Sequence, residues 1–190
     1  MDLELEKELV ERAKNDAQAF GALYDEYYGK IFGYALRRTA SIASAQDVTS
    51  EVFFKALRNI KGFQWRGIPF SAWLYRIASH EIANIYAGNG HDRVLTEELK
   101  HSLELEDASL EAEAAEAETL LQKQADFLAV HASLSKLPAR YQEVIALRFF
   151  EKKPLGEIAQ ILGKREGTVK SLLHRGLERL RKLMEENATF

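Results

Sequence analysis

The sequence predicts an all-α fold, and two observations carry the prediction. Stretches that alternate apolar and polar residues are almost absent from the 190 residues, and β-branched residues are scattered, so strands are not expected. Pro69, Pro138 and Pro154 each stand where a helix could begin, because the N–H that proline lacks is unpaired in the first helical turn anyway. Coarse helices are expected over residues 4–15, 17–38, 44–58, 70–86, 111–134, 138–150, 155–162 and 167–186.

Local signals mark helix ends and domain boundaries. Ser44, with Asp47 three residues later, resembles a helix N-cap followed by an acid in the first turn. Gly88-Asn89-Gly90 breaks the first block, and the Glu/Ala-rich stretch 110–118 favours helix by propensity but offers little apolar stripe. We therefore predict a first domain, an acidic and partly helical linker, and a second domain, over residues 1–90, 91–130 and 131–190.

The composition fits packed cores and excludes several functional classes. Hydrophobic residues make up 46% of the chain, and there is no cysteine, which excludes disulfides, zinc–thiolate sites and cysteine nucleophiles. No apolar run approaches the ~20 residues that a bilayer crossing needs, and the acidic start of the chain does not read as a signal peptide. We expect a cytoplasmic protein with no membrane insertion.

The net charge of −3 hides an uneven distribution. Residues 27–96 and 136–182 carry net charges of +5 and +7. Residues 1–26 and 97–126 carry −5 and −8. Two basic blocks separated by an acidic one suggest two polyanion-binding modules and a spacer. Several solvated helix faces with chance clustering would give the same charges, so charge alone leaves both interpretations open.

Residues 138–182 hold the most specific pattern. Two short amphipathic helices lead to Gly163, and a third helix opens near Gly167. Its apolar residues recur at helical spacing on one side, while basic and hydroxyl side chains fall largely on the other. This is the helix-turn-helix pattern, in which the last helix can lie in the DNA major groove and reach guanine edges. A three-helix core with a solvated basic face is the alternative from periodicity alone.

The residues of this block resemble a known family. The segments Leu134–Val144, Glu157-Ile158-Ala159 and Glu166–Arg175 are similar to region 4 of extracytoplasmic-function sigma factors, the smallest sigma subunits of bacterial RNA polymerase. LuxR-type regulators share part of the Gly-Thr-Val-Lys-Ser pattern. The resemblance implies that this domain reads the minus-thirty-five promoter element and touches the polymerase β flap. The expected DNA-binding residues are Arg165, Thr168, Lys170, Ser171, His174 and Arg175.

The N-terminal block resembles region 2 of the same family, in the family's order. Phe20–Tyr28 resembles its first conserved helix, Ala45–Phe53 the helix that docks on the β′ clamp, and Phe70–Ala78 the promoter-melting helix. The resemblance covers about 17–86 and 131–183, most of the chain. The expected clamp-binding residues are Gln46, Asp47, Ser50, Glu51 and Phe54.

The loop between the clamp and melting helices has the composition of a loop that binds single-stranded DNA. Aromatic, amide and basic side chains are interleaved there, so rings can stack on unpaired bases while Lys and Arg hold phosphates; a flipped base can also be read on its pairing edge. The expected minus-ten contacts are Lys61, Phe63, Gln64, Trp65 and Arg66, with Arg76, His80 and Asn84 along one side of the next helix. Packing of the domain is the alternative for these aromatics, and for Trp73 we favour packing.

Three departures limit the resemblance. Residues 84–90 are neutral where family members often carry an acid and several arginines, so upstream phosphate contacts there are in doubt. Ser50 replaces a usual glutamine in the clamp helix. Leu172 replaces a usual arginine at the edge of the apolar stripe, which removes one expected backbone contact.

Nothing in the sequence predicts catalysis. Phosphate-cradling, nucleophile-elbow and zinc-protease motifs are absent, and the five histidines are dispersed. We expect no enzyme, no catalytic residue, no metal and no cofactor. The acidic stretch 97–126 is either a solvated tether or a polyanion mimic that occupies a basic polymerase channel.

The expected function is that of an alternative sigma factor with two helical domains. Its expected partners are core RNA polymerase, through the β′ clamp and β flap, promoter DNA, and an anti-sigma factor. A sigma mimic that titrates an anti-sigma factor is one alternative, favoured by the neutral end of the melting helix. A stand-alone helix-turn-helix regulator is another, although it leaves the clamp-like helix unexplained. The spacer permits both packed and extended arrangements of the domains.

Overall fold

The protein is represented by a computed structural model, which describes residues 2–39, 41–88 and 133–187. These residues form helices and no strands, as the sequence predicted. The expected linker 91–130, and nearly all of the expected helix 111–134, lie outside the described residues.

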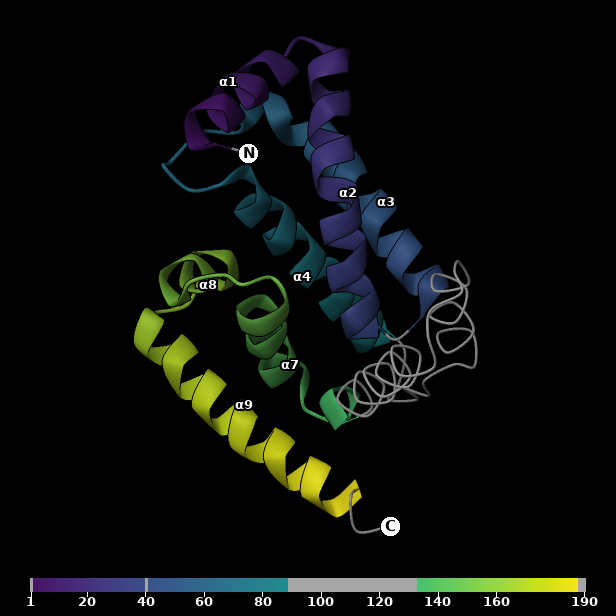
Figure 1. Ribbon diagram of the computed structural model, residues 1–190. Helices are drawn as coiled ribbons and strands as arrows, with labels where there is room; N and C mark the ends of the chain where they lie inside the picture. The colour runs from purple at the N-terminus through teal and green to yellow at the C-terminus, as the bar shows by residue number, and fades with distance from the viewer. Residues whose placement is uncertain (1, 40, 89–132, 188–190) are drawn as a thin grey trace, which may run out of the picture.

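The first four helices form an N-terminal bundle around a long central helix (Figure 1). They are α1 (Leu3–Ala13), α2 (Ala17–Thr39), α3 (Ile42–Asn59) and α4 (Phe70–Gly88), with the 3-10 turn η1 (Ile60–Gly62) after α3. Helix α2 contacts α1, α3 and α4. It therefore buries residues around much of its circumference rather than along one stripe.

Three helices and a π turn form the C-terminal bundle (Figure 1). They are α7 (Ala139–Ile145), the π turn η2 (Ala146–Phe150), α8 (Leu155–Leu162) and α9 (Glu166–Asn187). Helix α9 packs across α7 and α8. Gly176 makes the α7 crossing close, because a Cβ there would lie 3.2 Å from side-chain atoms of Tyr141 and Ile145.

Most helix bounds match the predicted ones within two residues, and two predictions were wrong. Ser44 is not the N-cap of α3: the extended Ser41 caps the helix, and its hydroxyl accepts the Ser44 N–H at 3.3 Å. The expected single helix 138–150 instead changes to π geometry at Ala146, where the Glu151 N–H bonds to the Ala146 carbonyl.

Proline and glycine mark the helix ends as expected. Pro138 and Pro154 occupy the positions just before α7 and α8, and Pro69 precedes α4. Gly163 ends α8 in the left-handed conformation (φ 61°), which lets the Lys164 N–H reach the Ala159 carbonyl at 2.9 Å. This cap turns the chain sharply from α8 into α9.

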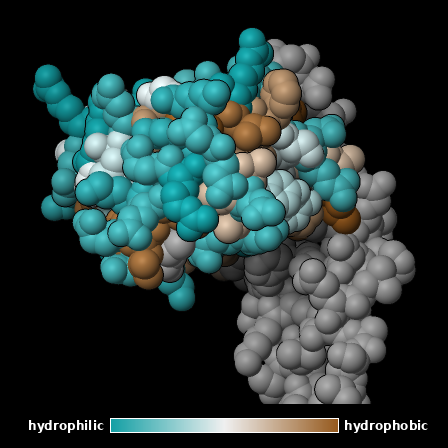
Figure 2. Space-filling model, turned by 90° about the horizontal axis from the view of Figure 1, so that it is seen from above, coloured by the Kyte–Doolittle hydropathy of each residue, from teal (hydrophilic) through white to brown (hydrophobic). Residues whose placement is uncertain are grey.

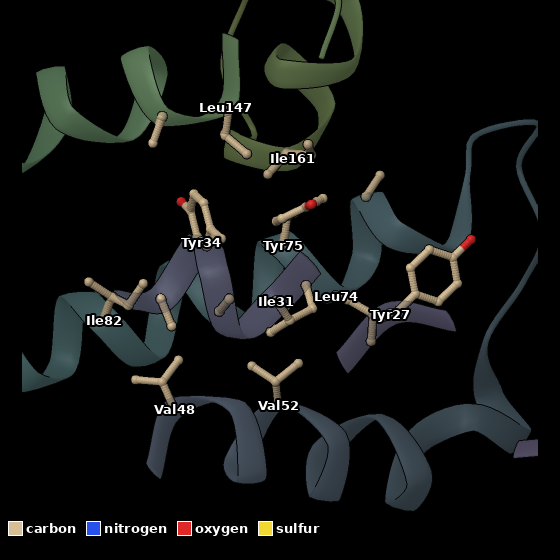
Figure 3. Close-up of a cluster of buried hydrophobic side chains, with 14 of the residues drawn as sticks. Tyr27, Ile31, Tyr34, Val48, Val52, Leu74, Tyr75, Ile82, Leu147 and Ile161 are labelled. Carbon is tan, nitrogen blue, oxygen red and sulfur yellow. The ribbon is translucent and has the colours of Figure 1, made fainter. Parts of the chain in front are cut away.

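The two bundles pack against each other. Helix α8 lies on α4, and η2 lies on α2. Figure 3 shows Val48 and Val52 of α3 on one side of the α2–α4 layer, and Leu147 and Ile161 of the C-terminal bundle on the other. Those two side chains point toward Tyr34 and Tyr75, which are 0% and 2% exposed. Of the two arrangements that the sequence allowed, the structure has the packed one.

Candidate nucleic-acid interface

A hollow of about 730 Å³ lies beside the loop that was predicted to read single-stranded DNA. It lies between the end of η1, the start of α4 and two residues of α8. Aromatic, amide and guanidinium groups line it together, which is the chemistry that binds an unstacked base. Its lining includes Phe63, Gln64, Arg66, Trp73, Arg76, Gln160 and Ile161.

The loop's side chains divide into exposed polar groups and half-buried aromatics. Lys61, Gln64 and Arg66 are exposed, whereas Phe63 and Trp65 are partly buried against the core. The Phe63 ring stands edge-on to Phe70, with centroids 5.4 Å apart. Half-burial fixes the orientation of these rings while leaving part of each surface free for stacking.

Trp73 packs in the same aromatic cluster. Its ring centroid lies 4.9 Å from that of Phe63 and 5.4 Å from that of Phe70. Packing was the favoured interpretation for Trp73 from sequence, and the contacts agree with it. The indole remains partly exposed and also lines the hollow.

A buried carboxylate holds the loop in place, and sequence reasoning missed it. Glu6 of α1 is 2% exposed; its Oε1 accepts the Phe70 backbone N–H at 2.9 Å and the Tyr27 hydroxyl. Phe70 opens α4, so the carboxylate satisfies an otherwise unpaired N–H at the helix start. Burial, with the Glu6 carboxylate next, raises the pKa of Tyr27, so the phenol stays a neutral donor. Helix α1 carries several acidic residues, and no sequence pattern distinguishes Glu6 from the others.

Three of the predicted contacts lie along α4, starting from Arg76 at the hollow. Arg76, His80 and Asn84 are all exposed, and their spacing of four residues places them on one side of the helix. Asn84 also lines a groove between α3 and α4, together with acidic Asp47 and Glu81. The row thus begins with the basic Arg76 and ends with the neutral Asn84, which lies beside carboxylates.

The predicted clamp-binding residues lie on the outer side of α3. Gln46, Asp47, Ser50 and Phe54 are exposed, Phe54 by 57%. Leu57 continues this face one turn later at 52% exposure and was missed by the sequence analysis. Figure 2 shows a largely hydrophilic face of the molecule on which apolar patches are small, so adjacent exposed apolar side chains on one helix are notable.

Glu51 differs from the other predicted clamp residues. It is partly buried and pairs with Lys55, whose ammonium lies 3.1 Å from Glu51 and 2.8 Å from Glu81. Hydrogen bonds to the two carboxylates, that to Glu81 first, raise the pKa of Lys55. This bridge ties α3 to α4 and leaves Glu51 less available to a partner than its neighbours.

The expected recognition helix presents its polar face fully to solvent. All six residues predicted there are exposed, while Val169, Leu172 and Gly176 are buried against the bundle. The Ser171 hydroxyl donates to the Gly167 carbonyl at 2.9 Å, and the Arg175 Nε donates to the Ser171 carbonyl at 3.2 Å. Leu172 is 8% exposed, so the family arginine that it replaces has no counterpart on the surface here.

Acidic residues also lie on this polar face, and Glu178 is one of them. Glu178 lies four residues after His174, with its carboxylate 3.5 Å from the His174 Nε2. Because residues four apart share a helix face, Glu178 lies beside the predicted DNA contacts. A carboxylate at this place repels phosphate, and Glu178 was not among the residues predicted from the sequence.

Comparison with known proteins identifies both halves of the chain. Residues 23–91 match the family described as Sigma-70 region 2, and residues 127–180 match Sigma-70, region 4. SigW of Bacillus subtilis, an ECF RNA polymerase sigma factor, is 31% identical over 98% of this chain and 100% of its own length. The chain belongs to the extracytoplasmic-function (ECF) sigma factors. BldN of Streptomyces coelicolor, of the same class, is 34% identical over 95% of this chain and 66% of its own.

Solved structures show the same fold. CnrH, solved in complex with the cytosolic domain of CnrY, aligns over 95% of this chain and 97% of its own, with a TM-score of 0.68 at 20% identity. RpoE of Bartonella quintana, solved with the anti-sigma factor NepR, aligns over 87% and 96%, with a TM-score of 0.64 at 20% identity. The predicted all-α architecture of sigma regions 2 and 4 is therefore confirmed.

Membership of the family settles the general function. This ECF sigma factor is an alternative sigma subunit that directs promoter recognition for transcription by RNA polymerase. Within residues 2–39, 41–88 and 133–187, no helix is both long and apolar enough to span a membrane.

Proposed function

We propose that the N-terminal bundle, residues 1–90, binds the β′ clamp and opens the minus-ten element, while residues 131–190 read the minus-thirty-five element and touch the β flap. The observation that carries this division is chemical. One bundle offers a walled hollow for an unpaired base, and the other offers an exposed, basic helix face for a duplex groove.

The minus-ten strand is proposed to enter the hollow beside residues 61–66. An extruded base would lie against the partly exposed rings of Phe63 and Trp73, with Gln64 in reach of its pairing edge. Lys61 and Arg66 project from the same loop and would hold the flanking phosphates. Arg76 and His80 would meet the duplex next to the melted segment.

The clamp contact is proposed to centre on the outer face of α3. Gln46, Asp47 and Ser50 supply polar groups, and Phe54 with Leu57 supplies the apolar anchor. An anchor of this kind contributes most of the binding free energy of a protein interface when it is desolvated. Glu51 has a smaller part because Lys55 holds it.

The chemistry of RNA synthesis is proposed to belong to the polymerase, so this chain acts as a recognition subunit without catalysis of its own and works in the cytoplasm. An anti-sigma factor is proposed as a further partner. The support is fold likeness to CnrH and RpoE, each solved with a bound protein, in the latter case the anti-sigma factor NepR.

Run-off transcription with core polymerase on a promoter library tests the proposal. Initiation at a subset of promoters is expected only when this chain is present. Association with core without initiation at any promoter, together with capture of an anti-sigma protein, would instead support the sigma-mimic alternative. Failure to associate with core would contradict the proposal.

Once a promoter is found, single substitutions test the reading surfaces. Arg175→Ala or Lys170→Ala should weaken holoenzyme binding by about 1–3 kcal/mol if the side chains contact bases. Arg181→Ala is the matched control, because Arg181 is exposed on the same helix and pairs with Glu185. Equal promoter binding by all three variants, measured by fluorescence anisotropy, would show that Lys170 and Arg175 do not contact the promoter.

A further inference from the structure

The hollow beside loop 61–66 has the size and the position of a small-molecule site. Its volume of about 730 Å³ lies within the range of roughly 300–1,000 Å³ that such sites occupy, and they are common between domains. Residues of α3, the loop and α4 form one side, and Gln160 and Ile161 of α8 form another. The proposed minus-ten contacts do not involve these two α8 residues, so the hollow as a whole has no ligand assigned to it.

The ionisable groups that line the hollow are cations. Arg66 comes from the loop and Arg76 from α4, and both side chains are exposed. Among the residues that the structure describes, no carboxylate lines the hollow, and neither guanidinium is paired with an acid. Guanidinium groups bind phosphate through paired N–H donors. The charge of the hollow therefore favours an anion, and a phosphate group suits these donors.

Flat apolar surface lies beside these cations. Phe63 and Trp73, whose ring centroids are 4.9 Å apart, are each partly exposed, and both line the hollow together with Ile68. A nucleobase stacks on aromatic side chains of this kind, since every base has a flat π-face. A phosphate joined to a nucleobase therefore fits the lining better than a phosphate alone.

Amide side chains supply hydrogen-bonding groups for the edge of a base. Asn59, Gln64 and Gln160 are exposed and come from three different segments of the chain. The side-chain nitrogen of Asn59 donates to the Lys55 carbonyl at 2.7 Å, which leaves its side-chain oxygen as an acceptor. An amide can accept from the N6 amino group of adenine while it donates to N7, whereas arginine is the usual partner of guanine. Because the two arginines suit the phosphate, the amides favour adenine.

We propose that this chain binds an adenine nucleotide in the hollow, with the base on Trp73, amides at its edge and the phosphate at Arg66 and Arg76. The bound nucleotide excludes the minus-ten strand, because the same aromatic rings are proposed to hold a base of that strand. It therefore competes with promoter opening. This competition rests on the proposed function, whereas the nucleotide site rests on the hollow alone.

Binding is measured with the full chain and adenosine 5′-monophosphate (AMP). The chain has two tryptophans, Trp65 and Trp73, and stacking on Trp73 should give saturable quenching of their fluorescence. Adenosine, which lacks the phosphate, should bind about 10-fold more weakly, and inorganic phosphate should not quench. Guanosine 5′-monophosphate should also bind about 10-fold more weakly, because the amides fit its edge poorly. Absence of saturable quenching by AMP would overturn the proposal.

Substitutions of exposed lining residues locate the site without disturbing the core. Arg66→Ala, Arg76→Ala and Gln160→Ala should each weaken AMP binding about 10-fold in isothermal titration calorimetry. Arg58→Ala is the matched control, because Arg58 is exposed near the end of α3 and is not among the lining residues. Equal affinity in all four variants would place AMP elsewhere and overturn the site. An unchanged affinity in Gln160→Ala alone would also overturn it, because the ligand would then not reach α8.

A single-stranded oligodeoxynucleotide of mixed sequence distinguishes the two sources of a base. Quenching by the oligonucleotide but not by AMP would overturn the nucleotide site and leave the proposed minus-ten contacts in place. Displacement of the oligonucleotide by AMP is the expected result. If AMP binds as described but run-off transcription with core polymerase shows no initiation at any promoter, the proposed function fails and the nucleotide site stands.

Discussion

The two bundles position their proposed reading surfaces in different ways. In the N-terminal bundle, Glu6 of α1 accepts the Phe70 N–H just after loop 61–66, and the Phe63 ring of the loop packs in an aromatic cluster. In the C-terminal bundle, the proposed reading side chains on α9 are exposed, and those of Ser171 and Arg175 donate to carbonyls of their own helix. The scaffold beneath them is closely packed at Gly176.

The difference matches two kinds of DNA reading. A base taken out of the stack binds best in a preformed pocket. Ordering a flexible loop on binding would cost free energy and so weaken the binding. A duplex groove instead presents the edges of stacked base pairs. Long, solvated side chains can reach these base edges by changing rotamer on binding. The N-terminal surface is therefore sensitive to changes in its support, and the C-terminal surface to changes in its exposed side chains or in the helix crossing.

The largest effect is expected at the helix crossing of the C-terminal bundle. Gly176→Val places a branched side chain where a Cβ alone would lie 3.2 Å from Tyr141 and Ile145. Overpacking of this kind costs about 3 kcal/mol, and hydrogen exchange should rise across α7–α9 more than in α1–α3. Gly167→Ala, where a Cβ would meet nothing within 4 Å, is the control and should leave stability unchanged or slightly raised. Equal unfolding midpoints for both variants would contradict the close crossing.

A smaller loss is expected when the loop anchor is removed. Glu6→Ala leaves the Phe70 N–H and the Tyr27 hydroxyl without their acceptor, which costs about 2 kcal/mol. Exchange should increase at residues 61–70, and transcription from melted templates should fall. Glu8→Ala, an exposed acid on the same helix, serves as control. Unaltered hydrogen exchange in the loop of the Glu6 variant would show that the aromatic cluster orders the loop without Glu6.

Alkaline pH should act on the buried phenols of the N-terminal bundle. Burial raises the pKa of Tyr34 to about 12, against 10.0 for the ordinary group. Between these values the unfolded chain releases the proton and the folded chain keeps it, so the free energy of unfolding falls by about 1.4 kcal/mol per pH unit for this residue. Tyr34→Phe should flatten the decline in denaturant melts above pH 10. A decline as steep in Tyr34→Phe as in exposed-site Tyr24→Phe would contradict the assignment.

The smallest effect is expected from the acid on the reading face of α9. Glu178→Gln removes charge repulsion with phosphate while the His174 side chain stays in place, so duplex promoter affinity should rise about twofold at low salt, with the gain screened as salt increases. Glu185→Gln, further along α9, should change affinity less. A fall in affinity for Glu178→Gln would mean that the carboxylate contacts a base directly.

Sequence reasoning predicted what depends on local pattern and on the family motif. The helix-turn-helix and its exposed face follow from periodicity, Gly163 and the sigma-like residues, and α8 was placed over 155–162 as observed. Glu6 and Glu151 could not be predicted, because their partners lie 64 and 114 residues away and no local signal distinguishes them from surface acids. The Ser41 cap was missed since Ser41 and Ser44 are equally good local candidates, and backbone conformation decides between them.

Lys152, which follows Glu151, has a positive φ of 53°, a conformation that costs a side-chain-bearing residue about 1 kcal/mol relative to glycine. The next residue, Lys153, donates its N–H to the Leu147 carbonyl at 2.9 Å, so the backbone of the C-terminal bundle itself holds this turn, and the turn presents the Glu151 carboxylate to Arg37 and Tyr75.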